Sequence, residues 1–419
     1  MYKIQEQMSV ETENNTDQTL TNKNYVKSLP RVLLVDSDET MGLEVYNYNS
    51  CSDNDTDVLK QCRGLVFQHD NLIFKGFTYT REYTYENYNN QELTQYTDLS
   101  TYRCFDAHEG TTIRVFYVHS MTATVASKWY ISTPKKLNVF RSKWSSKVSF
   151  GEKFETAVKK HMGMDLITFL ETLNKSRQYI FLLKNDNDNR IVCTPGEKSV
   201  YLIATLRHRD SNPLYDLLDM DTPLPVPEGQ LGISFPNEYK FNSMESLIDR
   251  VEDNGFNVTK GIICITSDKV DHPNHFKMIN SKYNYYQKIR NNVSSIKYRY
   301  LEIRLDADMV SDLIFLYPEY KQTFDAYEGA IYNVAKLIID AYKKRYIMKE
   351  FISVGQSEYG IMRECHGWHI KDRTRNKISL DKVIDVLNQT TSFVLNRIIK
   401  RFLATGKIER NFELTSESQ

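Results

Sequence analysis

The chain has 419 residues, of which 41% are hydrophobic and 26% charged, a composition typical of a globular protein of two or three domains. Lysine plus arginine and aspartate plus glutamate each number 54, so the formal net charge of zero excludes a globally basic nucleic-acid-binding protein. Any RNA site must be a local basic patch, and no apolar run reaches the ~18 residues of a membrane span, so no membrane partner is expected.

Residues 1–23 are dominated by polar side chains, which predicts a disordered tail. Alternating apolar residues then predict four strands, and the last two read as a hairpin across a polar turn. These strands are expected at 31–36, 42–48, 63–67 and 72–77.

The stretch from residue 102 to 117 organises the first half of the chain. An extended run enters it, Glu109 and Gly110 turn it, and an alternating strand leaves it. A glycine at this point allows a sharp turn or a close approach of the backbone to a ligand. An ordinary turn in a mixed domain is the alternative.

The next segments continue the alternation of strands and helices. We expect strands at 123–126, 129–132, 178–184, 200–206 and 260–265, helices at 154–173 and 244–255, and an irregular connection at 212–236. From residue 296 the pattern becomes helical, with a long amphipathic helix at 324–342 and a second from the N-cap Ser379 towards Gly406. The sequence thus predicts an α+β domain at 24–295, a helical domain at 296–410 and a tail at 411–419.

Four short segments resemble the nucleotidyltransferase domain of phage-type, ATP-dependent RNA ligases. They are Tyr46-Asn-Tyr followed by Cys62-Arg-Gly, Ala107-His-Glu-Gly, Asn189-Arg-Ile-Val and His275-Phe-Lys-Met-Ile-Asn-Ser-Lys-Tyr. The resemblance covers roughly residues 40–290. It implies a mixed, largely antiparallel nucleotidyltransferase fold.

The resemblance also implies that the catalytic groups are lost. Ala107 stands where the family carries the lysine that attacks ATP, and a nucleophile is required for that step. Leu182 and Lys260 stand where the family places carboxylates, Glu82 replaces a lysine, and Ile279 replaces another. No catalytic residue and no metal site are therefore expected. A substitute role for His108, a natural loss of activity and an engineered Lys-to-Ala change all remain open.

A remnant of the nucleotide pocket is expected from the same comparison. Its candidate residues are Arg63, Glu109, Gly110, Lys135 and Lys277. For Arg63, a solvent-facing arginine before a strand is an equal alternative.

Most local positive charge lies in the helical region, close to tyrosine and tryptophan. Basic groups interleaved with aromatic rings suit phosphate contacts and base stacking. The RNA-binding candidates are Lys343, Lys344, Arg345, Lys371, Arg373, Arg375 and Lys377, with solvated helix faces as the alternative. Cys365-His-Gly-Trp-His369 lacks a second half with zinc-site spacing, so a metal is not expected there.

Three functions follow from these observations. The first is an inactive RNA-ligase-like protein that binds RNA, with tRNA among the candidates. The second is an active ATP-dependent RNA ligase, using ATP and Mg²⁺, seen as a variant without its nucleophile. The third is a subunit of a viral transcription or RNA-processing complex, because the 28 tyrosines suit an AT-rich genome such as that of a large DNA virus or a protist. Six scattered cysteines favour reduced thiols in the cytoplasm, that of a host included, and a virion is the other expected location.

Overall fold

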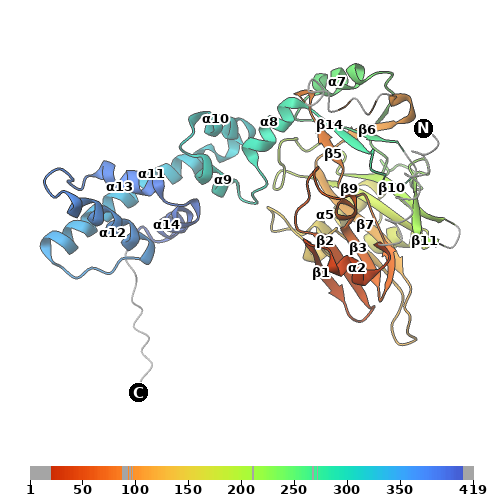
Figure 1. Cartoon of the computed structure of the whole chain (residues 1–419), viewed down its shortest axis with the longest axis horizontal. Coiled ribbons are helices and arrows are strands. Elements are labelled where there is room, and N and C mark those ends of the chain that lie inside the picture. Colours follow the sequence, from red (N-terminus) through yellow and green to blue (C-terminus); the bar gives the residue numbers. More distant parts are fainter. Residues whose placement is uncertain are drawn as a thin grey trace. The chain divides into compact units, whose positions relative to one another are not determined.

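The computed structural model describes residues 20–86, 93, 96, 98–209, 212–266, 269–270 and 272–408. The chain divides at Gln287/Lys288 into two compact units, called unit 1 and unit 2 below. Unit 1 holds three sheets with helices on them, and unit 2 is helical (Figure 1). The predicted α+β class is thereby confirmed. The predicted tails lie almost wholly outside the described residues, although Leu20, within the expected N-terminal tail, is buried.

The first sheet is fully antiparallel and follows chain order. It contains β1 (Val32–Asp38), β2 (Leu43–Tyr48), β3 (Arg63–Gln68) and β4 (Asn71–Phe74). All four strands were predicted, and so was the hairpin between β3 and β4. The short helices α2 (Lys23–Ser28) and α3 (Asp57–Gln61) share an apolar cluster with this sheet.

The second sheet is also antiparallel. Its order is β11 (Asn212–Asp219), β10 (Val200–Arg209), β9 (Arg177–Lys184), β7 (Gly110–Val118) and β8 (Lys128–Ser132). Helices α5 (Phe150–Met162) and α6 (Leu166–Thr172) pack on it through phenylalanine rings in edge-on and tilted contacts. Its other face meets the first sheet, where the rings of Phe74 and Phe116 lie 5.1 Å apart.

The third sheet is mixed. Its order is β12 (Glu238–Tyr239), β6 (Arg103–Ala107), β13 (Gly261–Ile265), β14 (Phe276–Ile279) and β5 (Arg81–Tyr83), and only the β14–β5 pair is parallel. Helix α7 (Met244–Asp253) packs over β14, and α8 (Ser281–Arg290) follows directly (Figure 1).

Unit 2 consists of helices on its described residues. They are α9 (Ile296–Ile303), α10 (Ala307–Leu316), a 3₁₀ helix η3 (Pro318–Tyr320), α11 (Lys321–Tyr342), a π-helix η4 (Lys343–Met348), α12 (Gln356–Lys371), α13 (Leu380–Gln389) and α14 (Ser392–Thr405). The predicted helix at 324–342 is confirmed within α11. The predicted caps Ser379 and Gly406 are also confirmed, because Ser379 accepts from Lys382 N and Gly406 is left-handed.

Two predicted helices are each interrupted by a local signal. The helix expected at 154–173 ends at Gly163, whose φ of 69° caps α5, and Asp165 starts α6 by accepting from Thr168 N. The helix expected from Ser379 to Gly406 breaks before Thr391, which caps α14. Helix α7 ends at Asp253, two residues before the predicted end at 255, because its C-cap Asn254 is extended.

Two strand predictions were wrong. No strand forms at 123–126, because the Ser120 hydroxyl bonds the backbone of Thr122 and its N–H donates to Ser127, which holds a turn. Conversely, 212–219 of the predicted irregular connection is β11. Pro213 is tolerated there because β11 is an edge strand.

Candidate functional site

A cavity of about 340 Å³ lies between the second and third sheets. Its walls come from β5, β6, β13 and β14 on one side and from β7, β9 and β10 on the other. Seven of the residues singled out in the sequence for this pocket line it: Arg63, Ala107, Glu109, Gly110, Leu182, Lys260 and Lys277. These residues come from segments far apart in the chain. The cavity is named the inter-sheet pocket below.

Lys135 is not part of this pocket. Its side chain is exposed, and its backbone N–H donates to Thr133 Oγ1 at 3.4 Å. Lys135 therefore does not line this pocket, and its role as a nucleotide contact stays a prediction. Ile279 is buried at the end of β14 and does not line the cavity either.

The organising loop connects β6 to β7 at the edge of the cavity. Ala107 ends β6 and accepts a hydrogen bond from the backbone N–H of Lys260 at 2.8 Å. Gly110 begins β7, where an added Cβ would lie 2.3 Å from the Leu183 carbonyl oxygen. The close approach of β9 therefore requires a glycine at this position.

Glu109 is buried and binds the protein itself. Its carboxylate accepts hydrogen bonds from three successive backbone N–H groups, those of Ile191 at 3.1 Å, Val192 at 2.6 Å and Cys193 at 3.0 Å. Charge-assisted bonds of this kind are the strong ones. Glu109 therefore anchors the 191–193 segment, and its role as a nucleotide contact stays a prediction.

A three-membered ion cluster occupies one end of the pocket. Glu82 Oε1 lies 2.7 Å from Lys260 Nζ and 3.0 Å from Lys277 Nζ. Glu82 and Lys260 are the two positions where the RNA-ligase resemblance implies the opposite charges. Here they contact each other, so the two reversals form one exchanged ion pair.

The charged groups of this cluster shift one another's pKa values. Burial alone would raise the pKa of Glu82, but Lys277 and Lys260 outweigh it and hold that pKa at about 2. Burial also lowers the pKa of Lys277, to about 8. The positive charges of Lys260 and Arg63 lower this pKa further, whereas Glu82 raises it. Arg63 lies in the same wall, and its guanidinium donates to the Thr78 carbonyl at 3.4 Å. The wall position favours the pocket interpretation of Arg63 over a solvent-facing one.

Two polar residues in the pocket were not predicted as contacts. Asp106 is buried with one carboxylate oxygen bonded to Asn237 at 2.8 Å and the other without a partner among the described residues. His108 stacks on Tyr201, with ring centroids 4.7 Å apart. Adjacent residues of a strand point to opposite faces, but β6 ends at Ala107, so His108 reaches the same cavity.

The protonation of His108 predicts an acid-dependent loss of stability. Burial, with Lys184 nearby, lowers the pKa of His108 to about 4. The unfolded chain, with a histidine pKa near ~6.5, then binds the proton more readily. Stability is therefore expected to fall as pH decreases from about 6.5 to about 4, by roughly 2 kcal/mol.

The test is urea denaturation of the chain and of His108→Phe at several pH values. The variant is expected to lack this part of the decline. An identical decline in both proteins would contradict the assignment.

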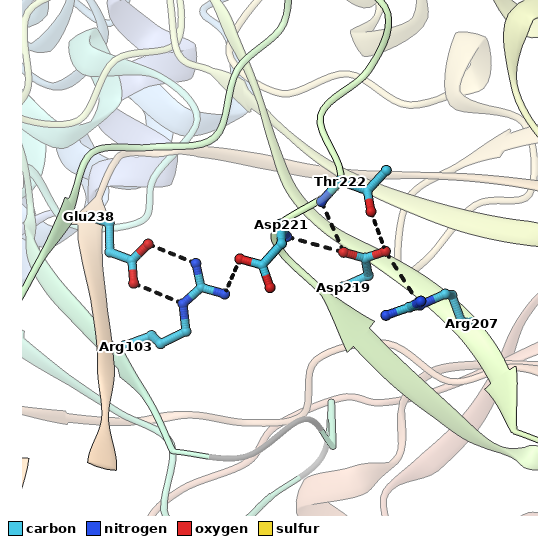
Figure 2. Close-up of polar contacts among 6 residues, drawn as sticks. All are labelled: Arg103, Arg207, Asp219, Asp221, Thr222 and Glu238. Atoms are coloured by element: carbon cyan, nitrogen blue, oxygen red, sulfur yellow. Dashed lines mark hydrogen bonds and ion pairs between the residues drawn. The ribbon is translucent and has the colours of Figure 1, made fainter. Parts of the chain in front are cut away.

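One wall of the pocket is held by an ionic network between the second and third sheets (Figure 2). Arg103 on β6 binds Glu238 on β12 through two bonds of 2.8 and 2.7 Å and reaches Asp221 at 2.9 Å. Asp219, at the end of β11, accepts from the Asp221 and Thr222 N–H groups. The network holds segment 219–238 at both ends. Met220 and Pro236, which line the pocket, lie within this segment.

A second cavity, of about 460 Å³, lies in unit 2 and is named the aromatic–basic pocket. It is lined by Ile339, Tyr342, Lys343, Tyr346, Ile347, Lys349, His366, His369, Ile370, Arg373, Lys377 and Ile378. Three of the predicted RNA-binding residues, Lys343, Arg373 and Lys377, meet here from two separate segments. Lys349 and the histidines were not predicted.

The other candidates lie outside this cavity. Arg375 is exposed and pairs with Asp372 at 3.8 Å, and the Arg345 guanidinium lies over the Tyr359 ring at 4.9 Å. Lys344 and Lys371 are exposed. Cys365 is buried in α12, and no group of three His, Cys, Asp or Glu side chains suited to a metal occurs in the described ranges.

Comparisons with known proteins give two relatives, and no family model matches the chain. A protein of Invertebrate iridescent virus 3, named "Immediate-early protein ICP-46 homolog", is 32% identical over 240 residues, which are 57% of this chain and 48% of that protein. A protein of the same name from Invertebrate iridescent virus 6 is 26% identical over 377 residues, covering 84% of this chain and 79% of that protein. The chain thus spans about half the length of the first relative. Both relatives support the prediction of a viral protein. Among the described helices, none has the length and apolar character to cross a membrane.

Proposed function

We propose that the chain is a non-catalytic, RNA-ligase-like protein that binds RNA through unit 2. The observation that carries RNA binding is the gathering of Lys343, Lys349, Arg373 and Lys377 around one cavity, the aromatic–basic pocket, without an acidic residue among its described lining. Clustered cations beside aromatic rings are the common requirement of single-stranded nucleic-acid sites. A role within a viral transcription or RNA-processing complex belongs to the same proposal.

The inter-sheet pocket supports the absence of catalysis. Its residues lack groups that a ligase needs to use Mg²⁺ and ATP, since Ala107 offers no nucleophile and Leu182 no oxygen ligand. Glu82 is held by two lysines, and Glu109 by three backbone amides. The carboxylates in the wall are largely committed to the protein, and Lys260 places a cation where the resemblance implies an anion.

Salt dependence tests the RNA-binding function. Each phosphate contact to a single strand contributes about −0.7 to the slope of log affinity against log salt, so four contacts give about −3. Affinity of the full chain for a single-stranded RNA is expected to fall about 50-fold between about 50 and 200 mM salt. Fluorescence anisotropy measures this directly. Absence of binding at low salt, or affinity independent of salt, would overturn the proposal.

A further inference from the structure

We infer that the aromatic–basic pocket holds one unpaired nucleotide of an RNA strand, with its base against the Tyr346–His366 rings and its phosphates on the surrounding cations. The inference rests on the proposed RNA-binding function and assigns the site and the form of RNA that it takes. Four features of unit 2 carry it.

The first feature is the π-helix that begins where α11 ends. The π-helix η4 is followed by Lys349 in a left-handed conformation with φ of 61°. Both are uncommon in proteins, and π turns often occur at functional sites. The turn places Tyr346 against α12, where its ring stacks on His366 with centroids 4.0 Å apart and planes 19° apart. His366 Nδ1 is also 3.0 Å from the Tyr342 hydroxyl.

The second feature is the fixed loop after α12. Asp372 accepts from the Thr374 and Arg375 N–H groups, and Asn376 Nδ2 donates to the Trp368 carbonyl at 2.7 Å. The loop is therefore closed onto the end of the helix. Arg373 and Lys377 reach the cavity, whereas Arg375 turns to Asp372.

The third feature is an uncompensated charge. The described lining contains four cations and no carboxylate, and none of these four cations forms an ion pair within the described residues. The four side chains are exposed, and an anion bound among them would reduce their mutual repulsion. Phosphates of a nucleic-acid backbone supply that charge at regular intervals.

The fourth feature is the apolar and aromatic remainder of the wall. A cavity of about 460 Å³ with four isoleucines and stacked rings is larger and less polar than a phosphate requires. A base offers a flat π-face to such a wall, and this contact does not depend on its identity. Bases inside a duplex are already stacked on each other, so the site selects an unpaired nucleotide.

The neighbouring titratable groups keep the wall suitable for stacking near neutral pH. Burial lowers the pKa of His366, and His369, Arg373 and Lys349 lower it further. The imidazole is therefore neutral at pH 7 and stacks without adding charge. His369 is fixed by a contact of 2.6 Å between its Nδ1 and the Asn376 carbonyl oxygen.

The experiment uses two matched triple variants of the full chain. Lys343→Gln/Arg373→Gln/Lys377→Gln removes three cations of the pocket, and Lys344→Gln/Lys371→Gln/Arg375→Gln removes the same charge from its surroundings. For a single-stranded RNA, the first is expected to lose about 30-fold in affinity and the second about 3-fold or less. A hairpin of equal length with a fully paired stem is expected to bind about 10-fold more weakly than the single strand.

Stacking is read separately with RNA that contains 2-aminopurine. Its fluorescence should be quenched on binding to the unaltered chain and to Tyr346→Phe, and should be quenched less with Tyr346→Leu. Photocrosslinking of a 4-thiouridine RNA to the unaltered chain needs no variant and should label the 342–349 segment. Equal losses in both triples, a preference for the hairpin, or crosslinks only in unit 1 would overturn the site. Failure of the unaltered chain to bind any RNA would instead overturn the proposed function.

Discussion

Glu82→Lys is expected to lower the free energy of unfolding of unit 1 by about 2 kcal/mol, whereas the exchange Glu82→Lys/Lys260→Glu should recover more than half of that loss. The single change leaves Lys260 and Lys277 without the carboxylate that each contacts within 3.0 Å. Breaking a buried pair costs about 3–5 kcal/mol. The value here is smaller because the Glu82 side chain is 38% exposed.

The measurement is urea denaturation followed by tryptophan fluorescence in a Trp368→Phe background, which leaves Trp129 and Trp144, both in unit 1, as reporters. Glu155→Lys, on the exposed face of α5 in unit 1, is the matched charge-reversal control, with an effect below about 0.5 kcal/mol. If the double variant were as unstable as the sum of Glu82→Lys and Lys260→Glu, the exchanged-pair interpretation would fail.

Glu109→Ala should destabilise unit 1 by about 3 kcal/mol in the absence of any ligand. The change leaves three buried backbone N–H groups at 191–193 without their acceptor, and each such group costs about 1–3 kcal/mol. Glu109→Gln should recover little of the lost stability. Both carboxylate oxygens accept hydrogen bonds from backbone N–H groups, and glutamine replaces one of them with an NH₂ group that cannot accept. The same Trp368→Phe background provides the readout.

Glu155→Ala, on the exposed face of α5, is the control and should change stability by less than about 0.5 kcal/mol. A residue whose only role is to contact a nucleotide would leave the stability of the free protein unchanged. A stable Glu109→Ala protein would therefore restore the nucleotide-contact interpretation.

Many residues of the inter-sheet pocket could be predicted from the sequence, because short motifs mark the strand ends and glycines that surround it. Arg63, Ala107, Leu182, Lys260 and Lys277 were selected from separate segments and lie together. The meeting of Glu82 with Lys260 could not be derived, since 178 residues separate them and no local pattern pairs them. The two charge reversals would have indicated an ion pair only if Glu82 and Lys260 had been compared with each other.

Other outcomes depended on details that the apolar pattern does not encode. Helix interruptions at Gly163 and Thr391 follow local capping, which a continuous apolar period conceals. The role of Glu109 depends on three amides more than 80 residues away. In unit 2, composition identified the basic segments but not which residues line the pocket. The π-helix and the loop after α12 place Lys343 and Arg373 in its lining, and leave Lys344 and Arg375 outside it.

We propose that the inter-sheet pocket does not transfer a nucleotide. Intact-protein mass spectrometry after incubation with ATP and Mg²⁺ tests it most directly, on the unaltered chain and on Ala107→Lys, with a competent RNA ligase in parallel. Losing one stabilising group typically costs a factor of about 10²–10³ in rate. Restored lysine alone would still lack the carboxylates implied near Leu182 and Lys260.

We therefore expect no AMP adduct on either protein. An AMP adduct on the unaltered chain, or at position 107 of the Ala107→Lys protein, would contradict the account. The second result would identify an ordinary ligase that lacks only its nucleophile.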